Sequence, residues 1–369
     1  VLQNGLAPEK GGYVSSGNSG SVGRLAVERV RFSNCQARGP SLIAGGAIYW
    51  TRSNGTLSLL DSEFLDNSVT ATAANGESSG GAVYAVTNLS ALRTLFEGNS
   101  AAATTGGGMG GAISLVGTAS SSTITESTFR FNTASPGMPL FGNGGAVYVG
   151  CDTCQAQIVR SYLRGNSANS GGAVYARKPS VGTMDVNVSL ANSTFYNSSV
   201  VNSGGAVYIG KNASLSSSNN TFYNADASAG AHLGFAAGSE VNYFRANLLA
   251  PTYAGTACSG TPTISNPGFV GFNLFSDSSC TGLGAGALPN SPLGSVMVDE
   301  RADQIGVLRF SGSAVIDSIT NGTICEPRDA RDQLRPLDGD GDGIADCDVG
   351  AYEDPHDIIF RDGFEAQLL

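Results

Sequence analysis

Hydrophobic and polar residues alternate with a period of two along many short stretches of the chain. Leu57 and Leu59 flank a serine, for example, and so do Val188 and Leu190. Clusters of Gly, Asn and Ser bound these stretches. Such alternation is typical of short β-strands with one buried face, and no long helical pattern separates them. The sequence therefore predicts an all-β protein built from short strands.

Two motifs recur in step along the chain. A Gly-Gly pair followed by Ala and a β-branched residue occurs at 45–49, 80–84, 110–114, 144–148, 171–175 and 204–208. A Phe-x-x-Asn motif follows most copies, as at 64–67, 96–99 and 129–132. A shared period indicates one structural unit stacked many times. Because each unit holds only short strands, we expect a right-handed, single-stranded parallel β-helix of about ten coils.

Stacking predicts where each motif residue points. The β-branched residue of each Gly-Gly motif should form an inward aliphatic ladder, and the next residue should face outward. The phenylalanine should stack inside, and the asparagine should bond neighbouring coils at a bend. We expect the same of Asn197 and Asn224, which stand one place earlier. The outward positions form a ladder of five tyrosines, interrupted by Ser114: Tyr49, Tyr84, Tyr148, Tyr175 and Tyr208.

Changes in pattern divide the chain into three parts. The expected β-helix body covers 1–298, with clear repeats at about 25–224 and irregular coils at 225–298. Residues 299–354 should form an acidic segment that caps the open end of the solenoid. Residues 355–369 read as a C-terminal tail or tag.

Charge is scarce and unevenly placed. The net charge is −10, and the chain from Asp299 onward holds 17 acidic residues against 6 arginines. The body is therefore nearly neutral and offers no basic surface for nucleic acid. No apolar stretch has the length of a transmembrane segment. We expect neither a nucleic-acid partner nor a membrane span.

Seven cysteines indicate an oxidising compartment. Redox chemistry or metal binding is the alternative for the Cys-x-x-Cys pair, but the sequence lacks the βαβ context or the further ligands that these need. The odd residue, Cys35, would have lost a partner upstream. We expect three local disulfides, formed by Cys151 and Cys154, Cys258 and Cys280, and Cys325 and Cys347.

These patterns resemble two groups of bacterial proteins. The repeats resemble those of chlamydial polymorphic outer-membrane proteins, which are surface adhesins. The C-terminal stretches 312–317, 332–336 and 347–353 are similar to the signature of secreted β-helix proteins with a choice-of-anchor segment. The stretch 358–365 resembles a short C-terminal signature on exported proteins of some gamma-proteobacteria. The resemblance implies a right-handed β-helix, export from a Gram-negative cell and a secreted or surface location, but no activity.

An acidic run near the C-terminus resembles the start of a calcium loop. Carboxylates that alternate along a loop converge into an oxygen cage for Ca²⁺. Val349 stands where such a loop has a bidentate glutamate, so Asp348 or Glu353 would replace it. The alternative is a solvated turn held by a disulfide. The expected ligands of this structural site are Asp338, Asp340, Asp342, the carbonyl of Ile344, Asp346 and Asp348.

The remaining features favour binding over catalysis. The tyrosine ladder offers flat rings to sugars or proteins, although the rings stacking on one another would explain it equally well. Long loops at one corner, which include Met138, Leu140 and Phe141, are the other expected binding surface. We predict a non-catalytic secreted or surface protein for adhesion or extracellular assembly, with a host or neighbouring-cell surface, a polysaccharide or itself as partner.

Two alternatives remain open. The first is an extracellular polysaccharide lyase or glycoside hydrolase of the pectin-lyase-like fold, with carboxylates such as Asp66 and Glu97 stacked on neighbouring coils. Scattered surface charges explain these residues better. The second is a structural subunit that assembles end to end into filaments. His232 is expected to be incidental.

Overall fold

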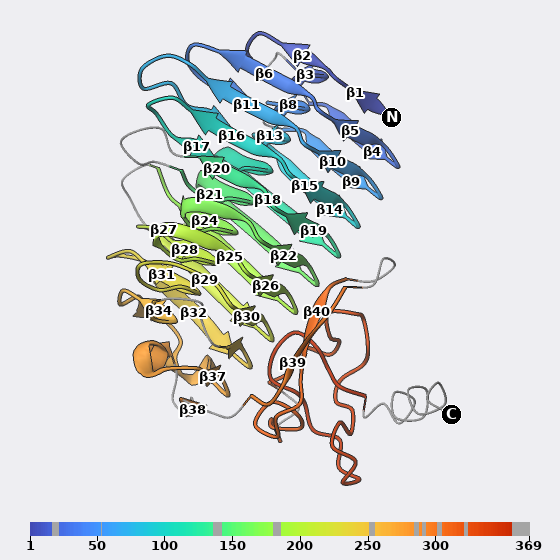
Figure 1. The fold of residues 1–369 in the computed structure, drawn as a ribbon, viewed down its shortest axis with the longest axis vertical. Coiled ribbons are helices and arrows are strands. Elements are labelled where there is room, and N and C mark those ends of the chain that lie inside the picture. Colours follow the sequence, from blue (N-terminus) through green and yellow to red (C-terminus); the bar gives the residue numbers. More distant parts are fainter. Residues whose placement is uncertain are drawn as a thin grey trace.

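The chain forms a parallel β-solenoid with a smaller C-terminal segment packed against its side (Figure 1). This computed structural model describes residues 1–16, 22–52, 54–135, 142–179, 186–250, 255–283, 288–289, 293–300, 305–320 and 324–355. The described residues contain no α-helix, only the 3-10 helices η1 (Pro267–Phe269) and η2 (Ser278–Leu283). Among them, no helix is long and apolar enough to cross a membrane. The predicted parallel β-solenoid is confirmed.

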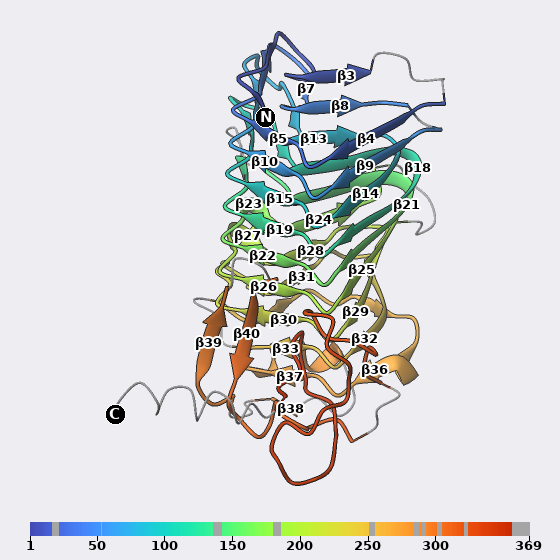
Figure 2. The ribbon, with the colours of Figure 1, turned by 90° about the vertical axis from the view of Figure 1, so that its right-hand side faces the viewer.

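One face of the solenoid is an eleven-stranded parallel sheet, the phenylalanine sheet. About six turns of the solenoid are regular, and shorter strands extend the stack beyond them. Figure 2 shows the coils lying one above another. The strands, in spatial order, are β1 (Leu2–Gln3), β5 (Arg31–Ser33), β10 (Glu63–Leu65), β15 (Leu95–Glu97), β19 (Thr128–Arg130), β22 (Tyr162–Arg164), β26 (Thr194–Tyr196), β30 (Thr221–Tyr223), β33 (Leu248–Leu249), β37 (Leu274–Phe275) and β38 (Leu288–Pro289).

A second face consists of two smaller parallel sheets. The seven-stranded sheet contains β2 (Leu6–Ala7), β6 (Gln36–Gly39), β11 (Ser68–Ala71), β16 (Ser100–Ala103), β20 (Thr133–Ser135), β23 (Ser167–Ser170) and β27 (Ser199–Ser203). The three-stranded sheet, which precedes the Gly-Gly turns, contains β7 (Ile43–Ala44), β12 (Ser78–Ser79) and β17 (Gly108–Met109).

The third face is the sheet with the most strands, and in each regular coil it begins with the β-branched residue that precedes the tyrosine position. Its strands are β3 (Val14–Ser16), β4 (Arg24–Glu28), β8 (Ile48–Trp50), β9 (Thr56–Leu60), β13 (Val83–Ala85), β14 (Asn88–Leu92), β18 (Ile113–Thr125), β21 (Val147–Val159), β24 (Val174–Arg177), β25 (Val186–Ala191), β28 (Val207–Ile209), β29 (Ala213–Ser218), β31 (Leu233–Phe235), β32 (Glu240–Arg245), β34 (Cys258–Ser259), β35 (Thr263–Ile264) and β36 (Val270–Gly271).

The core consists of in-register ladders of identical or similar side chains. Phe64 pairs with Phe32 and Phe96, and their rings stack at centroid distances of 5.0 and 4.9 Å. The β-branched residues that follow Gly-Gly-Ala are fully buried, as predicted. Parallel pairing brings the same position of each coil to within one strand spacing, about 4.8 Å, so one residue type that packs well serves every coil.

The two glycines of each Gly-Gly pair have different roles. The first has a positive φ in every copy, from 63° at Gly171 to 69° at Gly144, and glycine adopts this conformation without strain. The second lies against the next coil: a Cβ on Gly111 would be 2.1 Å from the carbonyl oxygen of Gly145. The pair is therefore required by a left-handed turn and by the close approach of backbones.

The predicted asparagine ladder exists, but only in part. Asn67, Asn99, Asn132 and Asn166 are buried, and the Asn99 Oδ1 accepts hydrogen bonds from the backbone and side-chain nitrogens of Asn67 at 3.0 and 2.9 Å. Asn197 and Asn224 lie at a bend and bond one another between coils, with the Asn224 Nδ2 donating to the Asn197 Oδ1 at 3.1 Å, but they do not belong to the buried ladder. Both have a φ of 53°, and the buried Ser198 follows Asn197 where the ladder residue would be. Asparagine is frequent at both places because it bonds backbone groups and also tolerates positive φ.

Cys35 is free and buried, and burial raises the pKa of its thiol. It stands at the asparagine-ladder position of the coil before Asn67, and its backbone N–H donates to the Asn67 Oδ1 at 3.0 Å. The other six cysteines form the pairs Cys151–Cys154, Cys258–Cys280 and Cys325–Cys347.

The C-terminal segment, residues 293–355, lies along the outward face of the phenylalanine sheet. It contains the antiparallel hairpin β39 (Val296–Asp299) and β40 (Val307–Phe310). Leu308, Phe310 and Val349 pack in one cluster with Leu248 and Leu274 of the sheet. We expected this segment to close the open end of the solenoid, but these contacts lie on its side (Figure 1). The outward Leu248 and Leu274 provide the apolar surface that favours this position.

Candidate functional site: a groove beside the C-terminal segment

A groove of about 780 Å³ lies between the phenylalanine sheet and the C-terminal segment. Its floor comes from three successive coils, at the starts of β15, β19 and β22, and its opposite wall comes from the segment. The floor residues are Arg93, Thr94, Leu95, Glu126, Thr128, Arg130, Arg160 and Tyr162. The wall residues are Glu300, Ile305, Gly306, Ala330, Arg331, Asp332 and Gln333.

The floor carries a ladder of alternating charge. Arg93, Glu126 and Arg160 occupy the same turn position in successive coils, with φ values of 47°, 49° and 46°. Arg160 pairs with Glu126 at 2.6 Å, and Arg93 pairs with Asp61 of the preceding coil at 2.7 Å. Because stacked positions lie about 4.8 Å apart, opposite charges in successive coils attract one another and hold the side chains in order.

Ion pairs connect the two walls. Arg160 lies 3.4 Å from Asp332 of the segment, and Arg164 lies 2.5 Å from Glu300. The Tyr162 hydroxyl also donates a hydrogen bond to Glu300. Burial and this carboxylate raise the pKa of Tyr162 above its usual value. The segment is thus fixed to the solenoid by charged groups that line the groove.

None of the five tyrosines proposed from the sequence for binding lines this groove. The tyrosines stand on a different sheet, where Tyr49 stacks on Tyr84 and Tyr175 stacks on Tyr208, each with centroids 5.2 Å apart. Their ring faces are therefore occupied by one another. Tyr148 is only 3% exposed. Burial raises the pKa of Tyr84 to about 12. This geometry favours a stabilising role for the ladder.

The apolar loop residues Met138, Leu140 and Phe141 lie outside the described residues. The two carboxylates considered for hydrolysis are also not brought together into a site. Asp66 stands beside Gly98 of the next coil, and Glu97 pairs with Arg130 at 3.0 Å.

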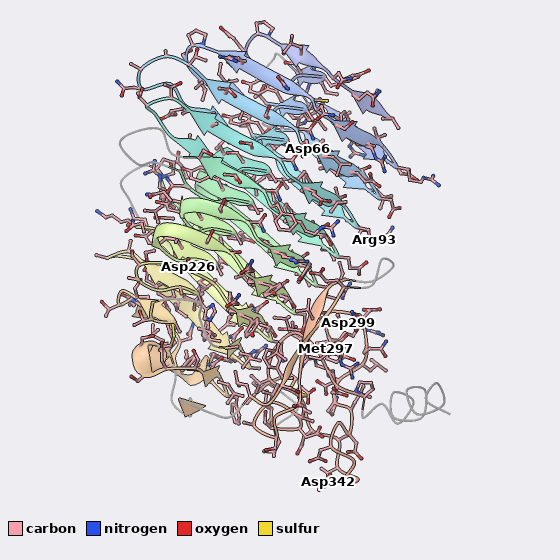
Figure 3. All side chains as sticks on the ribbon, viewed as in Figure 1. Asp66, Arg93, Asp226, Met297, Asp299 and Asp342 are labelled. Atoms are coloured by element: carbon pink, nitrogen blue, oxygen red, sulfur yellow. A yellow bond between two sulfur atoms is a disulfide. The ribbon has the colours of Figure 1, made fainter. Side chains whose placement is uncertain are left out.

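The acidic run forms a carboxylate group different from the predicted one. Oxygens of Asp317, Asp338 and Asp340 lie within 4.8 Å of one another. Asp317, which no loop motif indicated, joins because its Oδ2 accepts hydrogen bonds from the backbone of Gly339 and Asp340, both at 2.7 Å. Figure 3 places Asp342 at the end of the segment that lies away from Arg93 and the groove.

The other predicted calcium ligands do not join this group. The side chain of Ile344 points to solvent and is 60% exposed. Asp342 accepts a hydrogen bond from the backbone of Ile344 at 2.8 Å, and Asp346 lies in a bridge with Leu337. Asp348 is buried, and its carboxylate accepts hydrogen bonds from the backbone nitrogens of Asp317 and Asp354 at 2.8 and 2.7 Å. Each of its two oxygens thus already has a backbone donor.

The residues that carried the C-terminal resemblance form the polar core of the segment. Arg335 and Glu353 are fully buried and pair at 3.0 Å, and Arg335 also donates to the carbonyl of Asp348 at 2.9 Å. Two acidic groups share this one arginine. Burial and the nearby Glu353 charge raise the pKa of Asp348, and burial raises the pKa of Glu353 to about 7. The role of this signature in the structure is to organise the segment.

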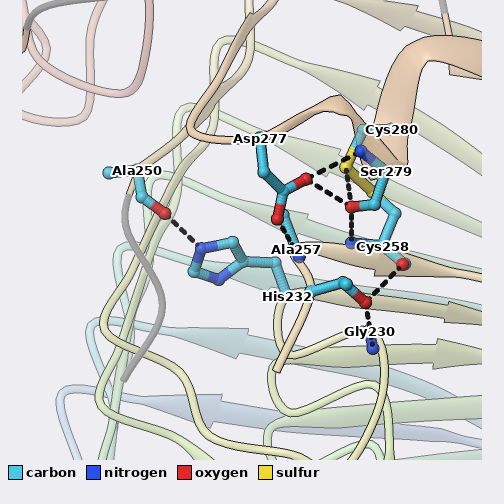
Figure 4. Close-up of a disulfide and its surroundings, with 9 residues drawn as sticks. Gly230, His232, Ala250, Ala257, Cys258, Asp277, Ser279 and Cys280 are labelled. Carbon is cyan, nitrogen blue, oxygen red and sulfur yellow. Dashed lines mark hydrogen bonds between the residues drawn. A yellow bond between two sulfur atoms is a disulfide. The ribbon is translucent and has the colours of Figure 1, made fainter. Parts of the chain in front are cut away.

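His232 is a buried structural residue near the Cys258–Cys280 disulfide (Figure 4). Its Nε2 lies 2.5 Å from the carbonyl oxygen of Ala250, and burial lowers its pKa to about 4. Asp277, in the same region, accepts hydrogen bonds from the backbone of Ala257 and Ser279 at 2.8 Å. The His232 imidazole is therefore neutral and enclosed, which fits a structural role in packing.

No protein-family model matches the sequence, and neither a curated protein nor a solved structure matches it. The groove was not predicted because its walls are far apart in the chain: Tyr162 and Glu300 are 138 residues apart. The alternation of Arg and Glu at one repeat position was the only sequence signal that pointed to its floor.

Proposed function

We propose that this protein is a non-catalytic β-helix protein of the secreted or surface-displayed class, acting in adhesion or extracellular assembly, and that it binds an extended polysaccharide in the groove. The observation that supports this proposal is the groove itself, because equivalent residues of successive coils form its floor. A linear polymer presents similar groups at regular intervals to a floor that repeats about every 4.8 Å. The disulfides are consistent with an extracellular location.

The groove chemistry supports a carbohydrate as the ligand. Its lining combines guanidinium groups, carboxylates and hydroxyls from Thr94, Thr128 and Tyr162. Guanidinium and carboxylate groups form directional, often bidentate, hydrogen bonds, and sugar hydroxyls both donate and accept such bonds. A few fixed polar groups in a concave site give orientation and specificity.

The same lining argues against hydrolysis. Glu126 and Glu300 pair with Arg160 and Arg164, and Asp332 lies 3.4 Å from Arg160. A glycosidase needs a pair of carboxyl groups that flank the scissile bond and act on the bound sugar, whereas these carboxylates are engaged by arginines. The alternative, an extracellular polysaccharide lyase or hydrolase, predicts product release from the bound polymer.

A groove-filling variant tests the proposal. Thr128 lies on the floor, and the paired position in the next coil is Tyr162, so Thr128→Tyr adds a side chain that this column already accommodates. Binding to a panel of polysaccharides should fall at least about tenfold. Thr70→Tyr, on β11 of the seven-stranded sheet, is the matched control and should bind normally. Failure of the wild-type protein to bind any polysaccharide would reject the proposal, and turnover would favour the enzyme.

We also propose a structural Ca²⁺ site at Asp317, Asp338 and Asp340. Hard oxygen ligands suit this ion, and the Oδ1 of Asp317 is buried without a hydrogen-bond partner among the described residues. Ca²⁺ should therefore raise the melting temperature of the wild type but not of Asp338→Asn/Asp340→Asn. Isothermal titration with Ca²⁺ that shows no heat, together with an unchanged melting temperature, would reject this site.

A further inference from the structure

Phe131 is an aromatic residue in a backbone conformation that disfavours it. It has a φ of 56° and is 50% exposed at the end of β19. Large side chains adopt positive φ rarely and under strain. The other coils place only Asn, Asp or Gly at this turn position: Asn34, Asp66, Gly98, Gly165, Asn197 and Asn224. Strain of this kind concentrates at functional sites.

The next coil leaves space for the ring. A Cβ on Gly165 would lie 2.7 Å from two ring carbons of Phe131, so the ring covers Gly165. The Arg164 guanidinium lies 5.6 Å from the centroid of the same ring. Part of the ring therefore packs on the solenoid, while half of the residue surface stays open to solvent.

Phe131 is not a lining residue of the groove, but the chain connects it directly to one. It follows Arg130, a floor residue, and its neighbour Arg164 bonds Glu300 of the opposite wall at 2.5 Å. The Nε atoms of Arg130 and Arg164 have no hydrogen-bond partner among the described residues. Each guanidinium has five N–H donors, and the carboxylates that pair with them, Glu97 and Glu300, leave donors over.

We infer that Phe131 is the stacking platform for an acidic sugar unit, a hexuronate, at the edge of the groove. This inference rests on the proposed function and names its ligand class. The apolar face of a sugar ring stacks on an aromatic ring. A sugar carboxylate is the acceptor that the surplus guanidinium donors require.

The test uses two substitutions that relieve the same backbone strain. Phe131→Asn installs a residue that other coils carry at this position. Phe272→Asn is the control, because Phe272 also has a positive φ, of 54°, and is exposed, but it follows β36 on another sheet, with no floor residue of the groove beside it in the chain. Both variants should melt at a higher temperature than the wild type. Phe131→Tyr retains the ring.

Affinities for oligogalacturonate and alginate oligomers, with dextran as the neutral control, give the outcome. We expect the wild type, Phe131→Tyr and Phe272→Asn to bind the acidic oligomers alike, Phe131→Asn to bind them about tenfold more weakly, and dextran to bind to none. Unchanged affinity of Phe131→Asn for the acidic oligomers, or equal binding of dextran, would overturn this inference but not the proposed function. Absence of binding by the wild type to any of the three would overturn the proposed function and the inference with it.

Discussion

The solenoid and the C-terminal segment are stabilised in opposite ways. In the solenoid each contact is repeated from coil to coil, as in the stacked Phe64 and Phe96 or the bonded Asn67 and Asn99. In the segment a single buried arginine, Arg335, serves the carboxylate of Glu353 and two carbonyl groups. Repetition distributes stability over many equivalent residues, whereas a unique network makes it depend on one.

The largest expected difference in the free energy of unfolding is between two Arg→Met variants, one in the segment and one in the solenoid. Arg335→Met removes the cation from a buried pair and should cost about 3–5 kcal/mol. Arg93→Met removes a half-exposed pair from the charge ladder and should change the free energy of unfolding far less, because solvent screens this pair. Denaturant unfolding, with proteolysis to locate the unfolded region, measures both. Similar losses for the two variants would contradict the comparison.

The second prediction separates two kinds of asparagine within the solenoid. Asn99→Ala leaves the buried N–H of Asn67 and the carbonyl of Phe64 without this partner, so it should cost about 2–3 kcal/mol. Asn197→Gly keeps the positive φ and should change the free energy of unfolding by less than about 0.5 kcal/mol. Denaturant midpoints at equal slope give both values. A larger loss in Asn197→Gly would mean that Asn197 also supports the stack.

The third and smallest effect is a pH dependence confined to the segment. The pKa of Glu353 is about 7 when folded, against an ordinary value of 4.5. Between these values the folded state retains a proton that the unfolded state has released, so stability falls as pH rises from about 4.5 to 7.

Hydrogen exchange of residues 293–355 at pH 5 and pH 8 measures this effect, and the solenoid amides are the internal reference. Glu353→Gln should be less stable than the wild type at both values but should lose most of the pH dependence. A segment that is more protected at pH 8 would show that the sign is wrong.

Sequence pattern predicted what repeats and missed what does not. The period of two and the Gly-Gly motifs indicated the sheets and the inward ladders, because equivalent residues have the same packing environment in every coil. The pattern did not separate Asn197, at a left-handed bend, from the buried ladder, because asparagine suits both places. Asp317 and the groove depend on contacts between distant segments, which carry no period. The strained Phe131 is visible only once the coils are aligned by their backbone angles.

The asparagine ladder gives the stack a direction. Each Oδ1 accepts hydrogen bonds from the coil before it, as Asn132 does from Asn99 and Asn166 does from Asn132. Cys35 stands at the ladder position before Asn67, and its thiol donates to the carbonyl of Leu2 in the coil before it, as the Asn67 side chain donates to the carbonyl of Phe32. The side-chain dipoles of the asparagines add head to tail along the axis, as peptide dipoles do in a helix. The ladder therefore has two different ends: a thiol in place of an amide before Asn67, and the buried Ser198 in the coil after Asn166.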